Sequence, residues 1–212
     1  MVRLVVMAAG QAKRMGKDKL ALTWNSSTVL GHVLEAILDA IERTDEPSWG
    51  FFTLAPLIEV VVVARQEIAT YATEPVIRKF RAIGGTWHHV PQPQPLAETI
   101  RLGLSNLPPD TDVIGFLPGD QVGVDAEILA KCLRKVVQTN LDFLVPISER
   151  LAGSPAFFHR RYVSALLELQ GEQGGRAVLN RYPERWTTYA VPPSFFQDVD
   201  TPEQYQQLRG NL

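Results

Sequence analysis

Apolar runs of strand length alternate along the chain with segments of helical periodicity. Almost every residue of 3–8 (RLVVMA) and 59–64 (EVVVVA) is apolar, which predicts strands that are covered on both faces. Between them, apolar residues recur every three or four positions, most regularly in 29–41, which predicts an amphipathic helix. We expect further strands at 86–90, 112–117 and 142–147, and further helices at 67–83, 96–107 and 125–138.

This alternation predicts an α/β fold of three layers, in which helices cover both faces of a mainly parallel sheet. Ligands of such sheets bind beyond the carboxyl ends of the strands, so the residues after Ala8, Leu117 and Val145 are candidates for a site. After position 148 the pattern is looser, and we expect strands at 153–158 and 186–191 and helices at 160–169 and 202–208. Residues 44–57 match neither period, so we expect a single domain over 1–212 with a loop insertion there.

The composition excludes several classes of protein. The chain has 212 residues and a formal net charge of −2, which offers no positive surface to a nucleic acid or an anionic membrane. Cys132 is the only cysteine and lies on an apolar helical face, so we expect a packed core thiol and no disulfide within the chain. No apolar run approaches the roughly 20 residues of a membrane span, and the N-terminal run is too short for a signal sequence. We therefore expect a soluble, cytoplasmic protein.

A glycine-containing basic loop follows the first predicted strand. The segment VVMAAGQAKRMGKDKLAL (5–22) carries Gly10 and Gly16 together with four cations, Lys13, Arg14, Lys17 and Lys19. Glycine lets backbone N–H groups approach a triphosphate closely, and an arginine fork matches phosphate oxygens. Neither Gly-Lys-Ser/Thr nor Gly-x-Gly-x-x-Gly is present, which excludes a Walker A loop and a dinucleotide fingerprint. We predict a phosphate-binding loop, with a solvated basic connection as the alternative.

Acidic residues follow two other predicted strands. Asp120 ends Pro118-Gly119-Asp120, directly after the strand at 112–117, and Asp198 and Asp200 precede a helix start at Thr201-Pro202. Mg²⁺ prefers one or two carboxylates together with phosphate oxygens and water, so Asp120 is a candidate ligand. The alternatives are a plain turn at Asp120 and acidic residues that cap the C-terminal helix.

Ala8-Ala9-Gly10, Arg14-Met15-Gly16 and Lys19-Leu20 together resemble the signature of the MobA-like NTP transferase family. The resemblance is nearest to its molybdenum cofactor cytidylyltransferase (MocA-like) branch, and it implies a Rossmann-like, GT-A-like nucleotidyltransferase fold. Ala-Ala-Gly stands where guanylyl-transferring relatives usually carry Ala-Gly-Gly, which favours CTP. The resemblance implies that Arg14, Lys19 and Asp120 are catalytic. It assigns nucleotide binding to Ala8, Ala9, Gly10, Arg14, Gly16 and Lys19.

The same resemblance extends over nearly the whole chain and assigns the remaining sites. Its two acidic motifs make Asp120 and Asp200 the ligands of Mg²⁺, although Val122 stands where the family usually has proline. In 93–104, which relatives use to hold base and ribose, Ala97 and Thr99 match loosely, whereas Pro95 and Glu98 depart. The segments GSPAFF (153–158) and GEQGGRAVL (171–179) imply three acceptor-binding residues, Gly153, Pro155 and Arg176.

The resemblance implies a Mg²⁺-dependent nucleotidyltransferase that transfers CMP from CTP to molybdopterin or its molybdenum-loaded form and releases pyrophosphate. One alternative is transfer to another phosphorylated metabolite, such as a sugar phosphate, phospholactate or methylerythritol phosphate. A second is a non-catalytic cofactor carrier with the same fold. The expected partners are CTP, a molybdopterin-type acceptor, and a molybdoenzyme client or maturation chaperone, but neither a nucleic acid nor a membrane.

Overall fold

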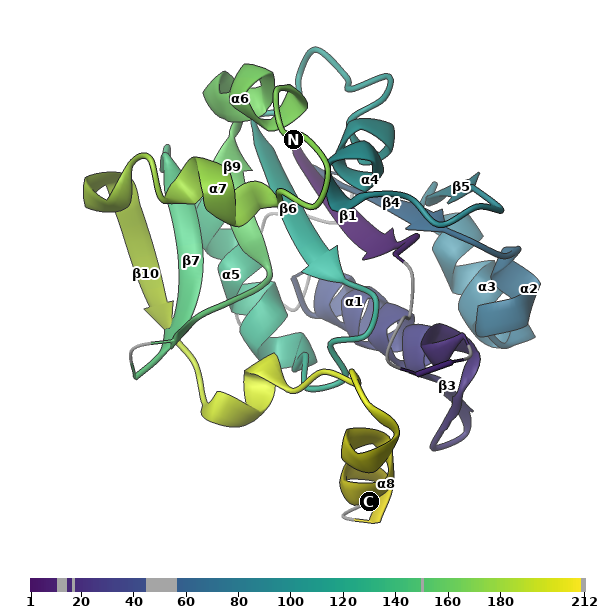
Figure 1. Ribbon diagram of the computed structural model, residues 1–212. Helices are drawn as coiled ribbons and strands as arrows, with labels where there is room; N and C mark the ends of the chain where they lie inside the picture. Colours follow the sequence, from purple (N-terminus) through teal and green to yellow (C-terminus); the bar gives the residue numbers. More distant parts are fainter. Residues whose placement is uncertain (11–14, 17, 45–56, 150, 211–212) are drawn as a thin grey trace.

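A central sheet of eight strands organises the molecule (Figure 1). The computed structural model describes residues 1–10, 15–16, 18–44, 57–149 and 151–210. The strand order is β10-β7-β9-β6-β1-β4-β5, and β8 pairs with β7. The strands of this sheet are β1 (Val2–Ala8), β4 (Ile58–Ala64), β5 (Thr86–His89), β6 (Val113–Pro118), β7 (Phe143–Ser148), β8 (Leu151–Ala152), β9 (Ala156–His159) and β10 (Trp186–Ala190).

Most pairs in this sheet are parallel, as the alternating pattern predicts. β1 lies between β4 and β6 in parallel register, with Val5 opposite Val61 on one side and Phe116 on the other. β4 pairs in parallel with β5, and β7 with β10. β9 departs from the pattern, because it lies antiparallel between β6 and β7. A separate small hairpin joins β2 (Thr23–Trp24) to β3 (Ser27–Thr28).

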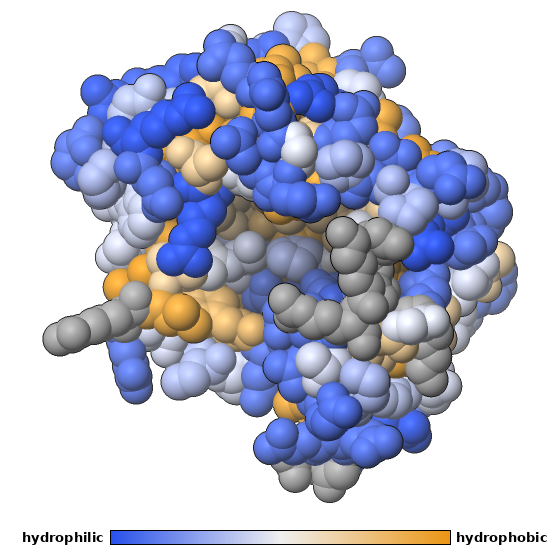
Figure 2. Space-filling view, in the orientation of Figure 1, coloured by the Kyte–Doolittle hydropathy of each residue, from blue (hydrophilic) through white to orange (hydrophobic). Residues whose placement is uncertain are grey.

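Helices cover both faces of the sheet and complete the three layers. Their bounds are α1 (Val29–Thr44), α2 (Ile68–Tyr71), α3 (Glu74–Ala82), α4 (Leu96–Gly103), α5 (Ala126–Gln138), α6 (Val163–Leu167), α7 (Gly175–Leu179) and α8 (Pro202–Gly210). Among the described residues, no helix is long and apolar enough to cross a membrane. The surface is mostly hydrophilic in the orientation of Figure 2, so the apolar side chains lie mainly beneath it.

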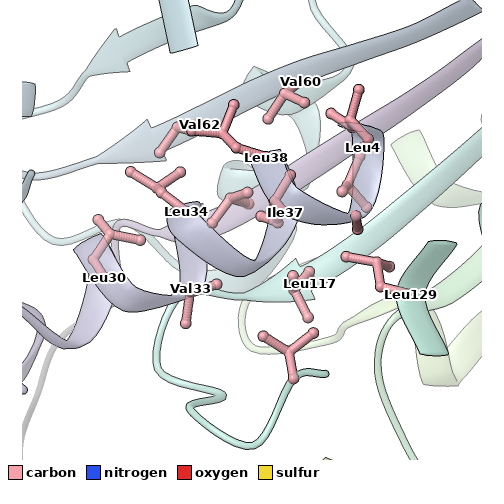
Figure 3. Close-up of a cluster of buried hydrophobic side chains, with 14 of the residues drawn as sticks. Leu4, Leu30, Val33, Leu34, Ile37, Leu38, Val60, Val62, Leu117 and Leu129 are labelled. Atoms are coloured by element: carbon pink, nitrogen blue, oxygen red, sulfur yellow. The ribbon is translucent and has the colours of Figure 1, made fainter. Parts of the chain in front are cut away.

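Alternation of side chains along β1 divides the core in two. Leu4 and Val6 point toward one face, where they pack in a cluster with residues of α1, α3 and α5. Val5 points to the other face and packs with residues of α4, α6 and α7. Figure 3 shows the first cluster, in which Leu34 and Ile37 of α1 lie against Leu4 and strand β4. Truncation of such a fully buried leucine to alanine typically costs roughly 2–5 kcal/mol.

Several predicted bounds differ from the structure for local reasons. The helix predicted at 67–83 is split into α2 and α3, and Pro75 lies in the first turn of α3, where its missing N–H costs no hydrogen bond. α4 ends at Gly103, four residues before the predicted end, and Asn106 has a positive φ of 50°. The strand predicted at 153–158 begins only at Ala156 as β9. The predicted insertion at 44–57 lies almost entirely outside the described residues.

Cys132 is fully buried in α5, which confirms the packed core thiol. Burial raises the pKa of this thiol to about 12, although the nearby Lys135 acts in the opposite direction. The thiol therefore stays protonated at neutral pH.

Candidate functional site

The site lies where the carboxyl ends of β1 and β6 meet, as the parallel topology predicts. The segment after β6 stays beside the end of β1, because Gly119 N–H donates to the Met7 carbonyl at 3.0 Å. This bond holds Asp120 beside the end of β1. The segment that follows β1 returns to the same place at Lys19, the first residue of a short 3₁₀ helix, Lys19–Ala21.

Lys19 forms the centre of a charged cluster. Its ammonium group makes ion pairs with Asp120 and with Asp200, and Nζ lies 2.7 Å from Asp200 Oδ1. The side chains of Lys19 and Asp120 are 16% and 17% exposed, whereas that of Asp200 is 37% exposed. The cluster is therefore partly shielded from water but open on one side to a ligand.

Charges within this cluster control the pKa of Lys19. Burial alone lowers the pKa, but attraction by Asp120 and by Asp200 outweighs this effect, so the pKa lies above its ordinary value. Lys19 thus stays an ammonium group at every physiological pH. Partial burial raises the pKa of the neighbouring Asp198, and repulsion from Asp120 and Asp200 adds to this shift. Two carboxylates therefore pair with one ammonium group, and a third, that of Asp198, lies near enough to be affected by their charges.

Asp200 reaches the cluster because two features hold the chain around it. The backbone N–H of Val199 donates to the Asp120 carbonyl at 3.1 Å. On the other side, Gln204 Oε1 accepts from the N–H groups of Asp200 and Thr201, and Thr201 Oγ1 accepts from Gln204 N–H. This is a capping box at the start of α8. The predicted helix start at Thr201-Pro202 is confirmed, and the helix cap also serves to place Asp200.

Asp18, the residue before Lys19, is held in place by hydrogen bonds within its own helix and from α2. Asp18 Oδ1 accepts from Leu20 N–H at 3.1 Å and caps the short helix that carries Lys19. Its other oxygen accepts a hydrogen bond of 2.8 Å from the hydroxyl of Tyr71, a fully buried residue at the end of α2. Burial and the bond to Asp18 raise the pKa of Tyr71, so the hydroxyl remains a donor. Two elements thus fix the backbone beside Lys19.

A cavity of about 900 Å³ opens beside the charged cluster. Lys19, Asp120 and Asp200 form its polar end, and Figure 2 shows a hollow on this face of the molecule. Its inner wall is largely apolar and is formed by Met7, Phe116, Val145, Phe158, Leu179 and Trp186. A glycine-rich rim is formed by Gly153, Ser154, Glu172, Gly174, Gly175 and Arg176, none of which is fully buried. The cavity therefore combines a charged end with a broad apolar surface and a glycine-rich edge.

The cavity gathers seven of the residues that the sequence singles out. They are Gly10, Lys19, Thr99, Asp120, Gly153, Arg176 and Asp200. Ala8 instead lines a smaller adjoining hollow of about 140 Å³, together with Asp18 and Lys19. Arg14, which is predicted to bind phosphate, lies outside the described residues.

Four predicted residues do not line either hollow. Ala9 and Ala97 are fully buried in the core on the α4 side of the sheet, and neither lines the cavity. Pro155 is buried, and Gly16 is exposed with a φ of 65°, which suits a turn. Ala9 still bounds the site through its backbone, because its carbonyl accepts from Gln94 N–H at 3.0 Å.

The apolar wall is the part of the site that sequence reasoning missed. Met7 and Phe116 lie one or two residues before the ends of their strands, and Phe158 lies in the antiparallel strand β9. The signal was present for the first two, because alternate residues near a strand's carboxyl end share one face. The place of Phe158 depends on the insertion of β9 between β6 and β7, which no local pattern reveals.

Asp120 and Asp200 have the chemistry that a hard divalent cation requires. The two carboxylates face the same position, because both form an ion pair with the ammonium group of Lys19. In the described part of the chain, no three His, Cys, Asp or Glu side chains gather to form a larger ligand set. Two carboxylates, with the remaining positions left to phosphate oxygens and water, are what Mg²⁺ commonly uses.

Comparisons with known proteins place this geometry in context. The sequence profile of the MobA-like NTP transferase domain matches residues 4–186. Rv0371c of Mycobacterium tuberculosis H37Rv superposes with a TM-score of 0.73 at 23% identity, over 100% of both chains. A manganese complex of Rv0371c gives a TM-score of 0.63 at 23% identity, over 100% of this chain and 99% of that one.

A more distant neighbour is a cytidylyltransferase from Leptospira borgpetersenii serovar Hardjo-bovis. It superposes with a TM-score of 0.61 at 17% identity, over 98% of this chain and 84% of that one. A search of curated proteins finds no match. The structural likenesses confirm the Rossmann-like nucleotidyltransferase fold.

Proposed function

Because this chain belongs to the MobA-like NTP transferase family, we propose that it transfers CMP from CTP to molybdopterin or its molybdenum-loaded form. The observation that carries the proposal is the cluster of Lys19, Asp120 and Asp200 at one end of the 900 Å³ cavity. A cavity of this size is large enough for a nucleotide and a second small molecule, and the cluster lies where their phosphates would meet.

The choice of nucleotide rests on two supports. Ala8-Ala9-Gly10 carries alanine where guanylyl-transferring relatives carry glycine. The cytidylyltransferase from Leptospira borgpetersenii shares the fold. In our proposal the backbone of Gly10 and the side chain of Thr99, both in the cavity wall, contact the nucleoside.

The apolar wall and the rim of the cavity support a flat acceptor with a phosphate group. Phe116, Phe158 and Trp186 offer an apolar surface on which a planar ring system would be buried. Arg176 and Gly153 lie at the rim, where a guanidinium group would bind a phosphate. A pterin phosphate combines both chemical features.

The reaction in this proposal is a direct displacement. An oxygen of the acceptor phosphate attacks the α-phosphorus of CTP, a new P–O bond forms, and the bond between the α-phosphorus and the bridging oxygen to pyrophosphate breaks. Lys19 stabilises the charge that develops on the phosphate oxygens, and Arg14 is assigned the same role. Asp120 and Asp200 would hold Mg²⁺, which would neutralise phosphate charge and align the two reactants when bound.

Pyrophosphate release by the purified protein tests this proposal. CTP, GTP, ATP and UTP are compared in the presence of Mg²⁺, each with and without molybdopterin. We expect release only with CTP and the pterin together. Release with CTP and a different phosphorylated metabolite would contradict the acceptor, and tight binding of CTP or the pterin without any release would indicate a carrier.

A pair of aspartate variants tests the role of the charged cluster. Asp120→Asn is expected to lower the rate about 10²–10³-fold, because it removes a proposed metal ligand from the reacting centre. Asp110→Asn makes the same chemical change at an exposed residue outside the cavity and is expected to retain full activity. Near-wild-type turnover by Asp120→Asn would contradict the metal site.

A further inference from the structure

Gln121 follows the proposed metal ligand Asp120, yet its own side chain points into the protein and is only 4% exposed. Its side-chain Nε2 donates two hydrogen bonds of 2.8 Å, one to the Ser154 carbonyl and one to the Phe195 carbonyl. The neutral NH₂ group of an amide is suited to this position, because both neighbours are acceptors and two N–H bonds are required.

The two carbonyls belong to different parts of the site. Ser154 lies in the cavity wall next to Gly153, on the side where the acceptor is proposed to bind. Phe195 lies in a 3₁₀ helix, Pro193–Phe196, that leads directly to Asp198 and Asp200. One buried amide group therefore joins the acceptor wall to the segment that carries the second carboxylate.

Close packing around Gln121 strengthens this connection. A Cβ atom at Gly153 would lie 2.5 Å from the ring of Phe196, so the acceptor wall rests directly on the C-terminal segment. Gly123 N–H donates to the Gln197 carbonyl at 2.9 Å, and a side chain at Gly123 would clash with the Ser194 carbonyl. Small residues thus allow the three segments to meet at Gln121.

We infer that Gln121 is a positioning residue that couples the acceptor wall at Gly153 and Ser154 to the carboxylate pair Asp120 and Asp200. Its side chain is buried and does not line the cavity. Its amide group instead fixes the distance between the place where the acceptor lies and the place where the cation is held. This inference rests on the proposed function, because that proposal assigns one side to the acceptor and the other to the cation. The hydrogen bonds that join the two sides do not depend on that assignment.

Gln121→Glu is the sharpest test, because it keeps the shape and replaces both donors by carboxylate oxygens that face two carbonyls. We expect deuterium exchange to increase in 151–159 and in 193–200 together. We expect Mn²⁺ binding, measured by electron paramagnetic resonance, to weaken roughly 10–100-fold, as is typical when a residue that orients metal ligands is changed. The KM for the acceptor is expected to rise, with little change in the KM for the nucleotide.

Thr44→Val is the matched control. Thr44 is fully buried at the end of α1, and its hydroxyl donates to the Ile41 carbonyl at 2.6 Å, outside the cavity wall. This variant also loses a buried hydrogen bond, so it reports what loss of stability alone does to Mn²⁺ affinity and to exchange in the two segments. We expect neither to change.

The outcomes separate this inference from the proposed function. Unchanged Mn²⁺ affinity and unchanged exchange in Gln121→Glu would overturn the inference, as would equal changes in Thr44→Val. If Gln121→Glu does not fold, Gln121→Asn, which is one methylene shorter, is expected to show the same changes to a smaller degree. Absence of pyrophosphate release by the wild type would contradict the proposed function alone, because exchange and Mn²⁺ binding need no acceptor.

Discussion

The ammonium group of Lys19 lies 2.7 Å from the carboxylate of Asp200, and this contact joins residues that are 181 positions apart in the sequence. The same group also pairs with Asp120. A divalent cation that binds both carboxylates must displace the ammonium group, since like charges repel strongly at such short range. Displacement would leave Lys19 available to bind a phosphate oxygen of the nucleotide.

Replacement of Lys19 by methionine is therefore expected to have two opposite effects. Mn²⁺ binding without nucleotide should tighten by about tenfold, because no ammonium group competes for the carboxylates. Turnover should fall about 10²–10³-fold, because the charge on the phosphate oxygens loses a stabilising partner. Titration calorimetry with Mn²⁺ and a pyrophosphate assay measure the two quantities.

Lys131→Met provides the control for this prediction. Lys131 pairs with Glu127 at 2.6 Å one helical turn away on α5, outside the cavity wall. The substitution removes a lysine ion pair outside the site, so neither Mn²⁺ affinity nor turnover should change. Weaker Mn²⁺ binding by Lys19→Met would show that the ammonium group supports the cation rather than competing with it.

The sequence predicts much of this site because parallel strands bring their carboxyl ends to one edge. Asp120 follows a strand that pairs with β1, and Lys19 lies in the loop that follows β1 itself, so their meeting is implied by topology. The prediction that Asp200 joins this site came from a family resemblance. The physical reason for it, a backbone bond from Val199 to Asp120 and a helix cap at Thr201, appears only in three dimensions.

Side-chain direction is the part that local patterns predict least well. Ala97 is next to Leu96 and two residues before Thr99, both of which line the cavity, yet its own side chain packs in the core. On a helix a shift of one position rotates the side chain by about 100°, so a loosely matched motif does not fix which residue faces a ligand. Local patterns do not predict the two hydrogen-bond partners of Gln121 either, because they lie 33 and 74 residues away in the sequence.

Tyr71 is expected to influence nucleotide binding from outside the cavity. Its hydroxyl donates to Asp18, which caps the helix that carries Lys19, and its raised pKa keeps the proton in place. Tyr71→Phe should lower the free energy of unfolding by about 1.5–3 kcal/mol, the range for a hydrogen bond to a charged acceptor. It should also raise the KM for the nucleotide.

Tyr162→Phe makes the equivalent change elsewhere. The Tyr162 hydroxyl donates to Asp142 at 2.9 Å, and neither residue lines the cavity. We expect a comparable loss of stability in a denaturant titration but an unchanged KM. An equal rise of KM in both variants would mean that general loosening of the fold, and not the position of Asp18, controls nucleotide binding.

His159 gives the fold a pH-dependent element that is separate from the site. Its Nδ1 accepts from the Arg161 N–H at 3.1 Å and caps the short helix Arg160–Tyr162, which requires the neutral ring. Burial lowers the pKa of His159, and repulsion from Arg161 lowers it further. The folded protein thus binds this proton less tightly than the unfolded chain does.

The sign of the pH effect follows from that difference. The contribution of His159 to stability is present above the ordinary histidine pKa of about 6.5 and is lost as the pH falls through the lowered value. His159→Ala should cost about 1 kcal/mol at pH 8, as loss of a helix cap does, and should flatten the stability profile below pH 6.5. Thermal unfolding at pH 5–8 measures both, and an unchanged profile would contradict the capping role.

Arg176 offers the most direct test of where the acceptor phosphate binds. It lies in the cavity wall at the first turn of α7, beside Gly174 and Gly175. Arg176→Ala should raise the KM for the acceptor about tenfold, because a guanidinium–phosphate bond of about 1.5 kcal/mol or more is lost, while the KM for CTP stays unchanged. Arg176→Lys should recover part of the loss, since lysine keeps the charge but not the fork.

Arg181→Ala removes an exposed arginine five residues further on that does not line the cavity, and it should leave both KM values unchanged. A rise in the KM for CTP in Arg176→Ala would instead place the nucleotide phosphates at this rim and reverse the proposed orientation of the two substrates.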